Sequence, residues 1–140
     1  MIRRAEAKDF NRIYDLICIL EDEKLPKALM RRFFLANLRD NRVFYWLYEK
    51  DKQSVGFISL HINFLIHHAA AVAEIQELVV LPEFQNNNIG GMLIETACET
   101  AKNMKCELIE VACNRRRTNA HFFYEKNGFE KTHFKFVKKF

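Results

Sequence analysis

The 140-residue sequence is poor in the residues that interrupt regular structure, with four glycines and two prolines. Disordered linkers and collagen-like repeats need far more of both, so the composition excludes them. No apolar stretch approaches the roughly 20 residues of a membrane-spanning helix. The sequence opens on Met1-Ile2-Arg3-Arg4 and lacks the apolar segment of a secretion signal. We therefore expect one cytoplasmic domain over residues 1–140, with no membrane partner.

The four cysteines, Cys18, Cys98, Cys106 and Cys113, include no Cys-x-x-Cys pair. This spacing argues against a zinc knuckle and against a thioredoxin-type redox site. Each cysteine lies in an apolar or helical stretch. We expect free thiols that pack as small hydrophobic side chains in a reducing compartment.

The charge is mildly positive, because 22 Lys and Arg oppose 18 Asp and Glu for a formal net charge of +4. The basic residues are dispersed, with short runs only at 115–117 and 138–139. A nucleic-acid-binding domain usually shows a continuous basic stripe, so no nucleic-acid partner is expected. The small excess is compatible with attraction of an anionic ligand.

Hydrophobic residues make up 49% of the chain and include 13 Phe, which predicts a core rich in aromatic packing. Apolar spacing and turn residues predict a mixed α/β domain in the order βααβββαβαβ. The expected strands are 2–5, 43–49, 55–66, 71–81, 107–112 and 132–137, and the expected helices are 9–20, 25–38, 90–104 and 119–126.

Residues 77–93 carry the strongest functional signal: a buried strand, then a polar loop from Pro82, then a helix from Gly90. A helix N-terminus presents unpaired N–H groups and a positive dipole end, which suit a pyrophosphate. Gly90 and Gly91 would let a phosphate approach the backbone, and asparagine tolerates the left-handed conformation that such loops use. An ordinary Asn-rich turn explains these residues equally well.

Two motifs carry a family resemblance. Residues 85–90, Gln-Asn-Asn-Asn-Ile-Gly, resemble motif A of the GNAT acetyltransferases, with Asn88 in place of the first motif glycine and Gln85 where arginine is commoner. Asn114, Asn119, Ala120, Phe123, Tyr124, Gly128 and Phe129 resemble the C-terminal motif of the same family. The resemblance implies the GNAT fold, a twisted mixed sheet of about six to seven strands, splayed between the fourth and fifth and flanked by about four helices.

The resemblance also implies that acetyl-CoA is the cosubstrate and that Tyr124 lies near its thioester sulfur. A tyrosine hydroxyl there can donate a proton to the leaving thiolate. The alternative for Tyr124 is a core aromatic on an amphipathic helix. The expected acetyl-CoA contacts are Leu78, Val79, Val80, Gln85, Asn86, Asn87, Asn88, Ile89, Gly90, Gly91, Asn114, Asn119, Phe122 and Tyr124.

Acetyl transfer requires a neutral amine, and an alkylammonium has a pKa of about 10, so a base is needed. By position, Glu74 is the first candidate and Glu77 the second. Regular strand alternation places these two side chains on opposite faces, although a β-bulge, which the family typically has here, would change that count. Either glutamate can equally be a salt-bridged strand carboxylate.

Residues 37–40, 60–61, 67–68, 73–80 and 133–136 are spread along nearly the full length. They resemble the subfamily that acetylates aminoalkylphosphonates, whose acceptor carries a primary amine beside an anion. Arg39, His61, His67 and His68 are the expected acceptor ligands, because guanidinium and imidazolium groups pair with phosphonate oxygens. The resemblance also implies an associated divalent cation, although the spacing of these residues does not by itself show a metal site. Surface or hydrogen-bonded core histidines are an equally good reading.

Two other functions remain open. A GNAT enzyme acting on a polyamine, amino acid or aminoglycoside would need an acidic acceptor pocket rather than a basic one. A CoA-binding module without catalysis would not need Tyr124 or Glu74. By analogy with the family, a homodimer is also expected.

Overall fold

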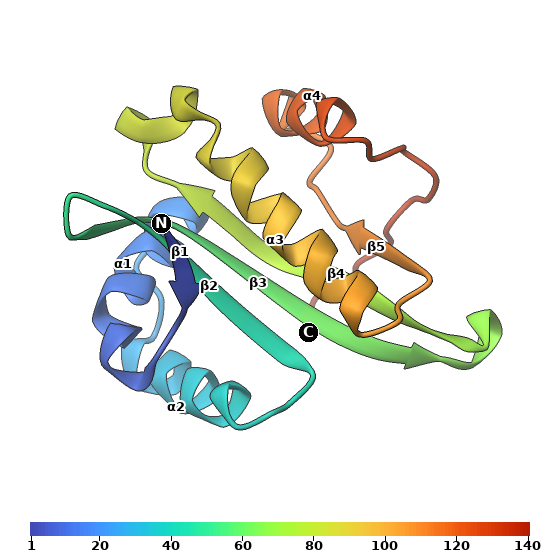
Figure 1. Cartoon of the computed structure of the whole chain (residues 1–140), viewed down its shortest axis with the longest axis horizontal. Helices are drawn as coiled ribbons and strands as arrows, with labels where there is room; N and C mark the ends of the chain where they lie inside the picture. Colours follow the sequence, from blue (N-terminus) through green and yellow to red (C-terminus); the bar gives the residue numbers. More distant parts are fainter.

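The computed structural model describes residues 1–140 as a five-stranded sheet with helices on both faces (Figure 1). The strands are β1 (Ile2–Arg4), β2 (Val43–Lys50), β3 (Gln53–Leu65), β4 (Ala70–Val80) and β5 (Leu108–Val111). The helices are α1 (Phe10–Glu21), α2 (Lys27–Leu38), α3 (Ile89–Asn103) and α4 (Thr118–Lys126), with short 3-10 turns η1 (Ala7–Asp9), η2 (Ile66–His68) and η3 (Pro82–Asn87).

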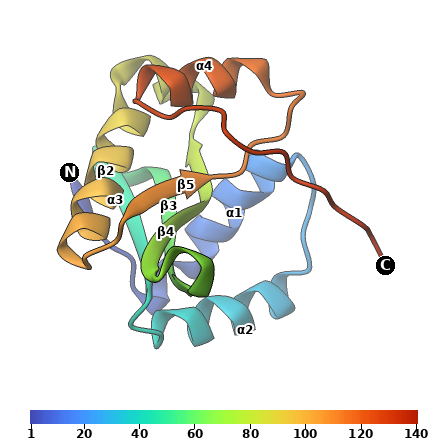
Figure 2. The ribbon, with the colours of Figure 1, turned by 90° about the vertical axis from the view of Figure 1, so that its right-hand side faces the viewer.

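The strands follow one another across the sheet in the order β1-β2-β3-β4-β5. All neighbouring pairs are antiparallel except β4 and β5, which are parallel and are joined by the crossover helix α3. Figure 2 shows α3 on one face of the sheet and α1 with α2 on the other. The mixed α/β class expected from the sequence is therefore confirmed.

An aromatic layer fills the face that α1 and α2 cover. The rings of Phe10 and Phe34 lie 5.6 Å apart, those of Phe34 and Tyr45 5.6 Å, and those of Tyr45 and Phe57 5.5 Å. On the opposite face, Gly56 gives α3 room to approach β3, because a Cβ there would lie 3.1 Å from Leu93. Four buried aromatic residues thus form the core on the side of the sheet that α1 and α2 cover.

A β-bulge in β4 changes which side chains share a face. Ile58 pairs with Leu78 and Leu60 pairs with Ile75, so Ser59 of β3 faces two residues of β4, Gln76 and Glu77. Paired residues of antiparallel strands project on the same face. The bulge therefore brings Glu77 to the face of Glu74, which pairs with His61. Plain alternation, which put the two glutamates on opposite faces, is wrong here.

The expected sixth strand at 132–137 is not formed, and the sheet has five strands rather than six or seven. The side chains of Phe134 and Phe136 are 93% and 94% exposed. Alternating apolar and polar side chains identify a segment that can form a strand, but a strand also needs a sheet edge to pair with. Residues 132–137 pair with no strand of this chain.

The four cysteines are free and half-buried, as the sequence indicated. None of the helices is both long enough and apolar enough to cross a bilayer.

We expect Leu60→Ala to destabilise the fold by about 2–5 kcal/mol, the usual cost of truncating a fully buried leucine. Leu60 is 0% exposed on the central strand β3, whereas Leu29 on α2 is 44% exposed. Leu29→Ala removes the same atoms and should cost far less. Urea denaturation of both variants measures the difference, and equal losses would contradict the core described above.

Candidate active site

The candidate active site begins where β4 and β5 separate. The two strands are paired only from Val72 opposite Leu108 to Ile75 opposite Val111. β4 continues to Val80, still paired with β3 on its other edge. The edge of β4 from Gln76 onward therefore presents main-chain N–H and C=O groups that β5 does not use, and such groups need partners.

A cleft of about 360 Å³ occupies the space between the separated strands. It is bordered by β4, by the chain that leaves β5, by the end of α1 and by α4. Its lining residues are Leu20, Glu21, Ile75, Gln76, Leu78, Val111, Ala112, Cys113, Asn114, Arg117 and Tyr124. Of the β4 residues expected to contact acetyl-CoA, Leu78 faces this cleft, whereas Val79 is a core residue.

The loop from β4 to α3 has the form expected of a phosphate-binding turn. Residues 82–87 form η3, Asn88 adopts the left-handed conformation with φ 56°, and α3 starts at Ile89. The Met92 N–H donates to the Asn88 carbonyl and closes the first helical turn. The preceding amides of Ile89, Gly90 and Gly91 have no helical acceptor and are free to meet an anion. Gln85, Asn86, Asn87 and Asn88 are all exposed beside them.

The two glycines serve packing as well as access. A Cβ on Gly90 would lie 2.9 Å from Cζ of Phe123, so the missing side chain lets α4 pack on α3. A Cβ on Gly91 would collide with Oδ1 of Asn88, the N-cap residue of α3. Gly90 is buried, so helix contact rather than phosphate approach explains it. Sequence spacing could not separate these two roles.

Tyr124 faces the cleft from α4. Its ring packs edge-on against Phe123 at 5.4 Å and against Phe129 at 5.6 Å. Burial raises the pKa of Tyr124 to about 12, with a smaller upward effect of Cys113 and a downward effect of Arg117. The hydroxyl is thus protonated at neutral pH and can donate a hydrogen bond or a proton.

The loop between β5 and α4 is organised by Asn114. Its Oδ1 accepts the Arg116 N–H at 2.9 Å and its carbonyl accepts the Arg117 N–H at 3.0 Å. This turn points Arg117 at the cleft, a cation that the sequence motifs did not single out. Asn119 and Phe122 are exposed on α4 and do not line the cleft. The lining of the cleft therefore does not support the contacts with acetyl-CoA expected of Asn119 and Phe122.

Glu77 is held in place by Ser59. The Ser59 hydroxyl donates to Oε2 of Glu77 and accepts the Glu77 N–H at 3.0 Å. Burial raises the pKa of Glu77, the Ser59 hydrogen bond and the nearby charge of His61 oppose the shift, and Glu21 adds to it. A carboxylate with a raised pKa is a suitable proton acceptor near neutral pH.

The other carboxylates differ in position. Glu74 accepts a hydrogen bond from Nε2 of Gln76 at 2.7 Å, and neither Glu74 nor Glu77 is among the residues that line the cleft. Glu21, at the end of α1, does line it and interacts with Glu77 through space. Sequence reasoning missed Glu21 and Ser59, because only the packing of α1 and β3 against β4 brings them to Glu77.

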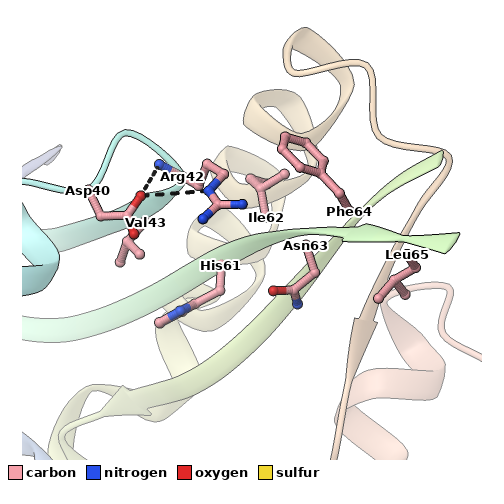
Figure 3. A pocket seen from close by; sticks show the side chains of 8 residues that line it. All are labelled: Asp40, Arg42, Val43, His61, Ile62, Asn63, Phe64 and Leu65. Atoms are coloured by element: carbon pink, nitrogen blue, oxygen red, sulfur yellow. Dashed lines mark hydrogen bonds and ion pairs between the residues drawn. The ribbon is translucent and has the colours of Figure 1, made fainter.

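His61 lines a notch of about 380 Å³ at the start of β2, where β3 continues beyond its pairing with Val43 (Figure 3). Figure 3 shows His61 and Asn63 on one face of β3, with Arg42 above the strand. The Arg42 guanidinium lies 5.2 Å from the centre of the Phe64 ring, and its Nε lies 3.9 Å from Oδ1 of Asp40.

The structure does not bring the expected acceptor ligands together. His67 and His68 lie in η2 at the tip of the β3–β4 hairpin, where Nδ1 of His68 is 3.0 Å from Oε2 of Glu107. Arg39 is exposed at the end of α2 and lines neither cavity. No group of three or more His, Cys, Asp or Glu side chains that could hold a metal ion is present. The residues therefore do not fit a divalent-cation site, and no step is assigned to one.

Comparisons with known proteins agree with this geometry. The family model described as "Acetyltransferase (GNAT) family" matches residues 10–129. A Salmonella typhimurium protein named aminoalkylphosphonate N-acetyltransferase is 42% identical over 98% of this chain and 89% of its own length.

Solved structures show the same fold. A transcriptional regulator from Bacillus halodurans superimposes with a TM-score of 0.90 at 22% identity, covering 100% of this chain and 99% of its own. An aminoglycoside N-acetyltransferase solved in complex with CoA superimposes with a TM-score of 0.89 at 17% identity, covering 99% of this chain and 93% of its own.

The environment of Glu77 predicts a pH-dependent stability. Its pKa is raised above the ordinary 4.5 of the unfolded chain, so the unfolded state releases this proton first. Glu77 therefore lowers the free energy of unfolding as pH rises from 4.5 through the folded-state pKa. We expect the neutral isostere Glu77→Gln to be more stable than wild type near pH 8 and equal to it near pH 4.

Thermal unfolding across this pH range tests the effect, with Glu23→Gln as the matched control on an exposed glutamate. A stability gain for Glu77→Gln that is the same at both ends of the range would contradict the raised pKa.

Proposed function

Because the chain belongs to the GNAT acetyltransferase family and is an acetyl-CoA-dependent N-acetyltransferase, we propose that its acceptor is a small aminoalkylphosphonate. The observation that carries the proposal is the 42% identity, over 98% of the chain, to a protein named for that activity. The cleft adds a second reason, since it presents both a carboxylate, Glu21, and a guanidinium, Arg117, to a zwitterionic acceptor.

Acetyl-CoA fits the residues that surround the cleft. The free amides at the start of α3 are placed for the pyrophosphate, and the unpaired edge of β4 beyond Ile75 is placed for the amide groups of the pantetheine arm. The thioester would then end beside Tyr124 and Leu78.

The proposed reaction is direct transfer. Glu77, directly or through water, takes a proton from the acceptor ammonium. The neutral nitrogen attacks the thioester carbonyl, forming the C–N bond, and the C–S bond then breaks. Tyr124 donates its proton to the departing thiolate, because its raised pKa keeps the hydroxyl protonated until charge develops on sulfur. The nitrogen then gives up its second proton, directly or through water, to the Tyr124 phenolate, which leaves the amide, free CoA thiol and a re-protonated tyrosine.

The phosphonate must be bound close to the cleft. His61 pairs with Glu74 and its charge acts on Glu77, but it lines the notch at the start of β2 and not the cleft. In aminoethylphosphonate only two carbon atoms separate nitrogen from phosphorus, so the anion lies within a few bonds of the reacting amine. Arg117 in the cleft is therefore a better ligand for the anion than Arg39 or the histidines at the hairpin tip.

The glutamates on the sheet favour a second candidate function, the acetylation of a cationic acceptor. Glu74 and Glu77 share one face and Glu21 borders the cleft, an arrangement that would also suit a cationic acceptor such as a polyamine.

Tyr124→Phe should lower kcat by about 10²–10⁴-fold, the usual contribution of a general acid, and leave the KM for acetyl-CoA nearly unchanged. Steady-state assays of thiol release measure both constants. Tyr48→Phe, on β2, is the matched control. Wild-type kcat in Tyr124→Phe, with chemistry rate-limiting, would show that Tyr124 serves packing alone.

An acceptor panel tests the substrate and its ligand together. We expect kcat/KM for aminoethylphosphonate to exceed that for ethylamine by at least about tenfold, since a hydrogen bond to a charged group contributes about 1.5–3 kcal/mol. Arg117→Ala should abolish this preference, and Arg116→Ala in the same loop should retain it.

Equal turnover of the two amines would remove the phosphonate from the proposal and leave acetyl transfer in place. A preference for spermidine would favour the cationic acceptor. Loss of the preference in Arg39→Ala rather than in Arg117→Ala would return the anion site to the end of α2.

A further inference from the structure

Ser59 is a polar residue in the middle of the core. It lies on the central strand β3 and is 0% exposed, between Ile58 and Leu60, which are also 0% exposed. A buried hydroxyl destabilises a fold unless its hydrogen bonds are made. Alanine would fit the same position without a polar group to satisfy, so packing alone does not explain a serine here.

Both hydrogen bonds of the Ser59 hydroxyl go to one residue, Glu77. Oγ accepts the Glu77 main-chain N–H at 3.0 Å, and the hydroxyl donates to Oε2 of the Glu77 side chain. The β-bulge makes this possible, because Ser59 lies opposite both Gln76 and Glu77 rather than one residue of β4. One serine therefore holds the main chain and the carboxylate of the same glutamate.

The direction of these two bonds distinguishes the ionised form of Glu77 from the neutral form. A serine hydroxyl has a single proton to donate, and here it goes to Oε2. A carboxylate accepts such a proton more strongly than a neutral carboxyl group does. A carboxyl proton on Oε2 would also leave the serine hydrogen without its acceptor, at a position that solvent does not reach. The pair is therefore complementary to the carboxylate.

The other titratable groups around Glu77 share its face of the sheet or act on it through space. They are Glu21 of α1, Tyr45 of β2, His61 of β3 and Glu74 of β4. Burial is the largest influence and raises the pKa of Glu77, and the hydrogen bond from Ser59 is the largest influence that lowers it. Without Ser59, the buried carboxyl group would hold its proton to a higher pH.

We propose that Ser59 is a positioning residue for acetyl transfer, whose hydroxyl keeps the Glu77 carboxylate ionised and oriented to accept a proton. The proposal rests on the proposed function, in which Glu77 is the base. Because Ser59 engages Oε2, the other oxygen, Oε1, is left to take the proton, directly or through water. An N–H bond of the acceptor ammonium breaks, an O–H bond forms at Oε1, and Glu77 later returns this proton to solvent.

Ser59→Ala tests the proposal through the pH dependence of kcat/KM, whose acidic limb reports the ionisation of the base. The limb should move to higher pH by at least about one unit, which is about tenfold in kcat/KM on its acid side, and the plateau at higher pH should be retained. Ser59→Thr keeps the hydroxyl and should keep the wild-type limb. Ser54→Ala, at the other buried serine of β3, is the matched control and should not move it.

A titration followed by carbon NMR adds a readout that does not depend on turnover. The side-chain carboxyl signal of Glu77, identified by its absence in Glu77→Gln, should titrate at higher pH in Ser59→Ala than in wild type. An unchanged titration would overturn the proposal, as would a loss of activity in Ser59→Ala that is equal at every pH.

The activity of Glu77→Gln separates two kinds of failure. An inactive Glu77→Gln beside an unchanged titration in Ser59→Ala would overturn the role of Ser59 alone and leave Glu77 as the base. Full activity of Glu77→Gln would overturn the proposed base, and with it the role of Ser59 in the reaction.

Discussion

The separation of β4 from β5 after four paired residues is the constraint on which the rest of the site depends. Had β4 and β5 stayed paired, the main-chain groups of β4 beyond Ile75 would be hydrogen-bonded to β5 and no cleft would exist. Their separation opens a cleft of about 360 Å³ and leaves main-chain donors and acceptors on its wall. The start of α3, the loop after β5 and the ring of Tyr124 all matter chemically because they surround this gap.

The bulge opposite Ser59 is the second determining feature. One extra residue in β4 turns Glu77 toward the face of α1, where Ser59 holds its carboxylate and Glu21 lies near. The same environment that raises the pKa of Glu77 makes its ionised form a cost to the fold. Stability and proton transfer are therefore opposed at this residue, a common condition of catalytic carboxylates.

The two sides of the sheet differ in how well they are closed. The β1–β3 side is backed by an aromatic layer and by α1, whereas β5 is a short edge strand and α4 buries no residue completely. The openness of this side of the sheet leaves the cleft accessible to substrate.

The residues by themselves determined the fold class, the order of the elements, the loop that ends in a left-handed Asn88, and the cleft position of Tyr124. These follow from local periodicity, turn chemistry and a family motif, all of which are written along the chain. Five strands instead of six or seven, the common face of Glu74 and Glu77, and the separation of His61 from His67 and His68 were decided by the tertiary structure. So were the contributions of Ser59, Glu21 and Arg117. Each of these depends on which segments meet across the sheet, and one bulge or one unpaired edge changes that outcome while leaving the local pattern of the sequence the same.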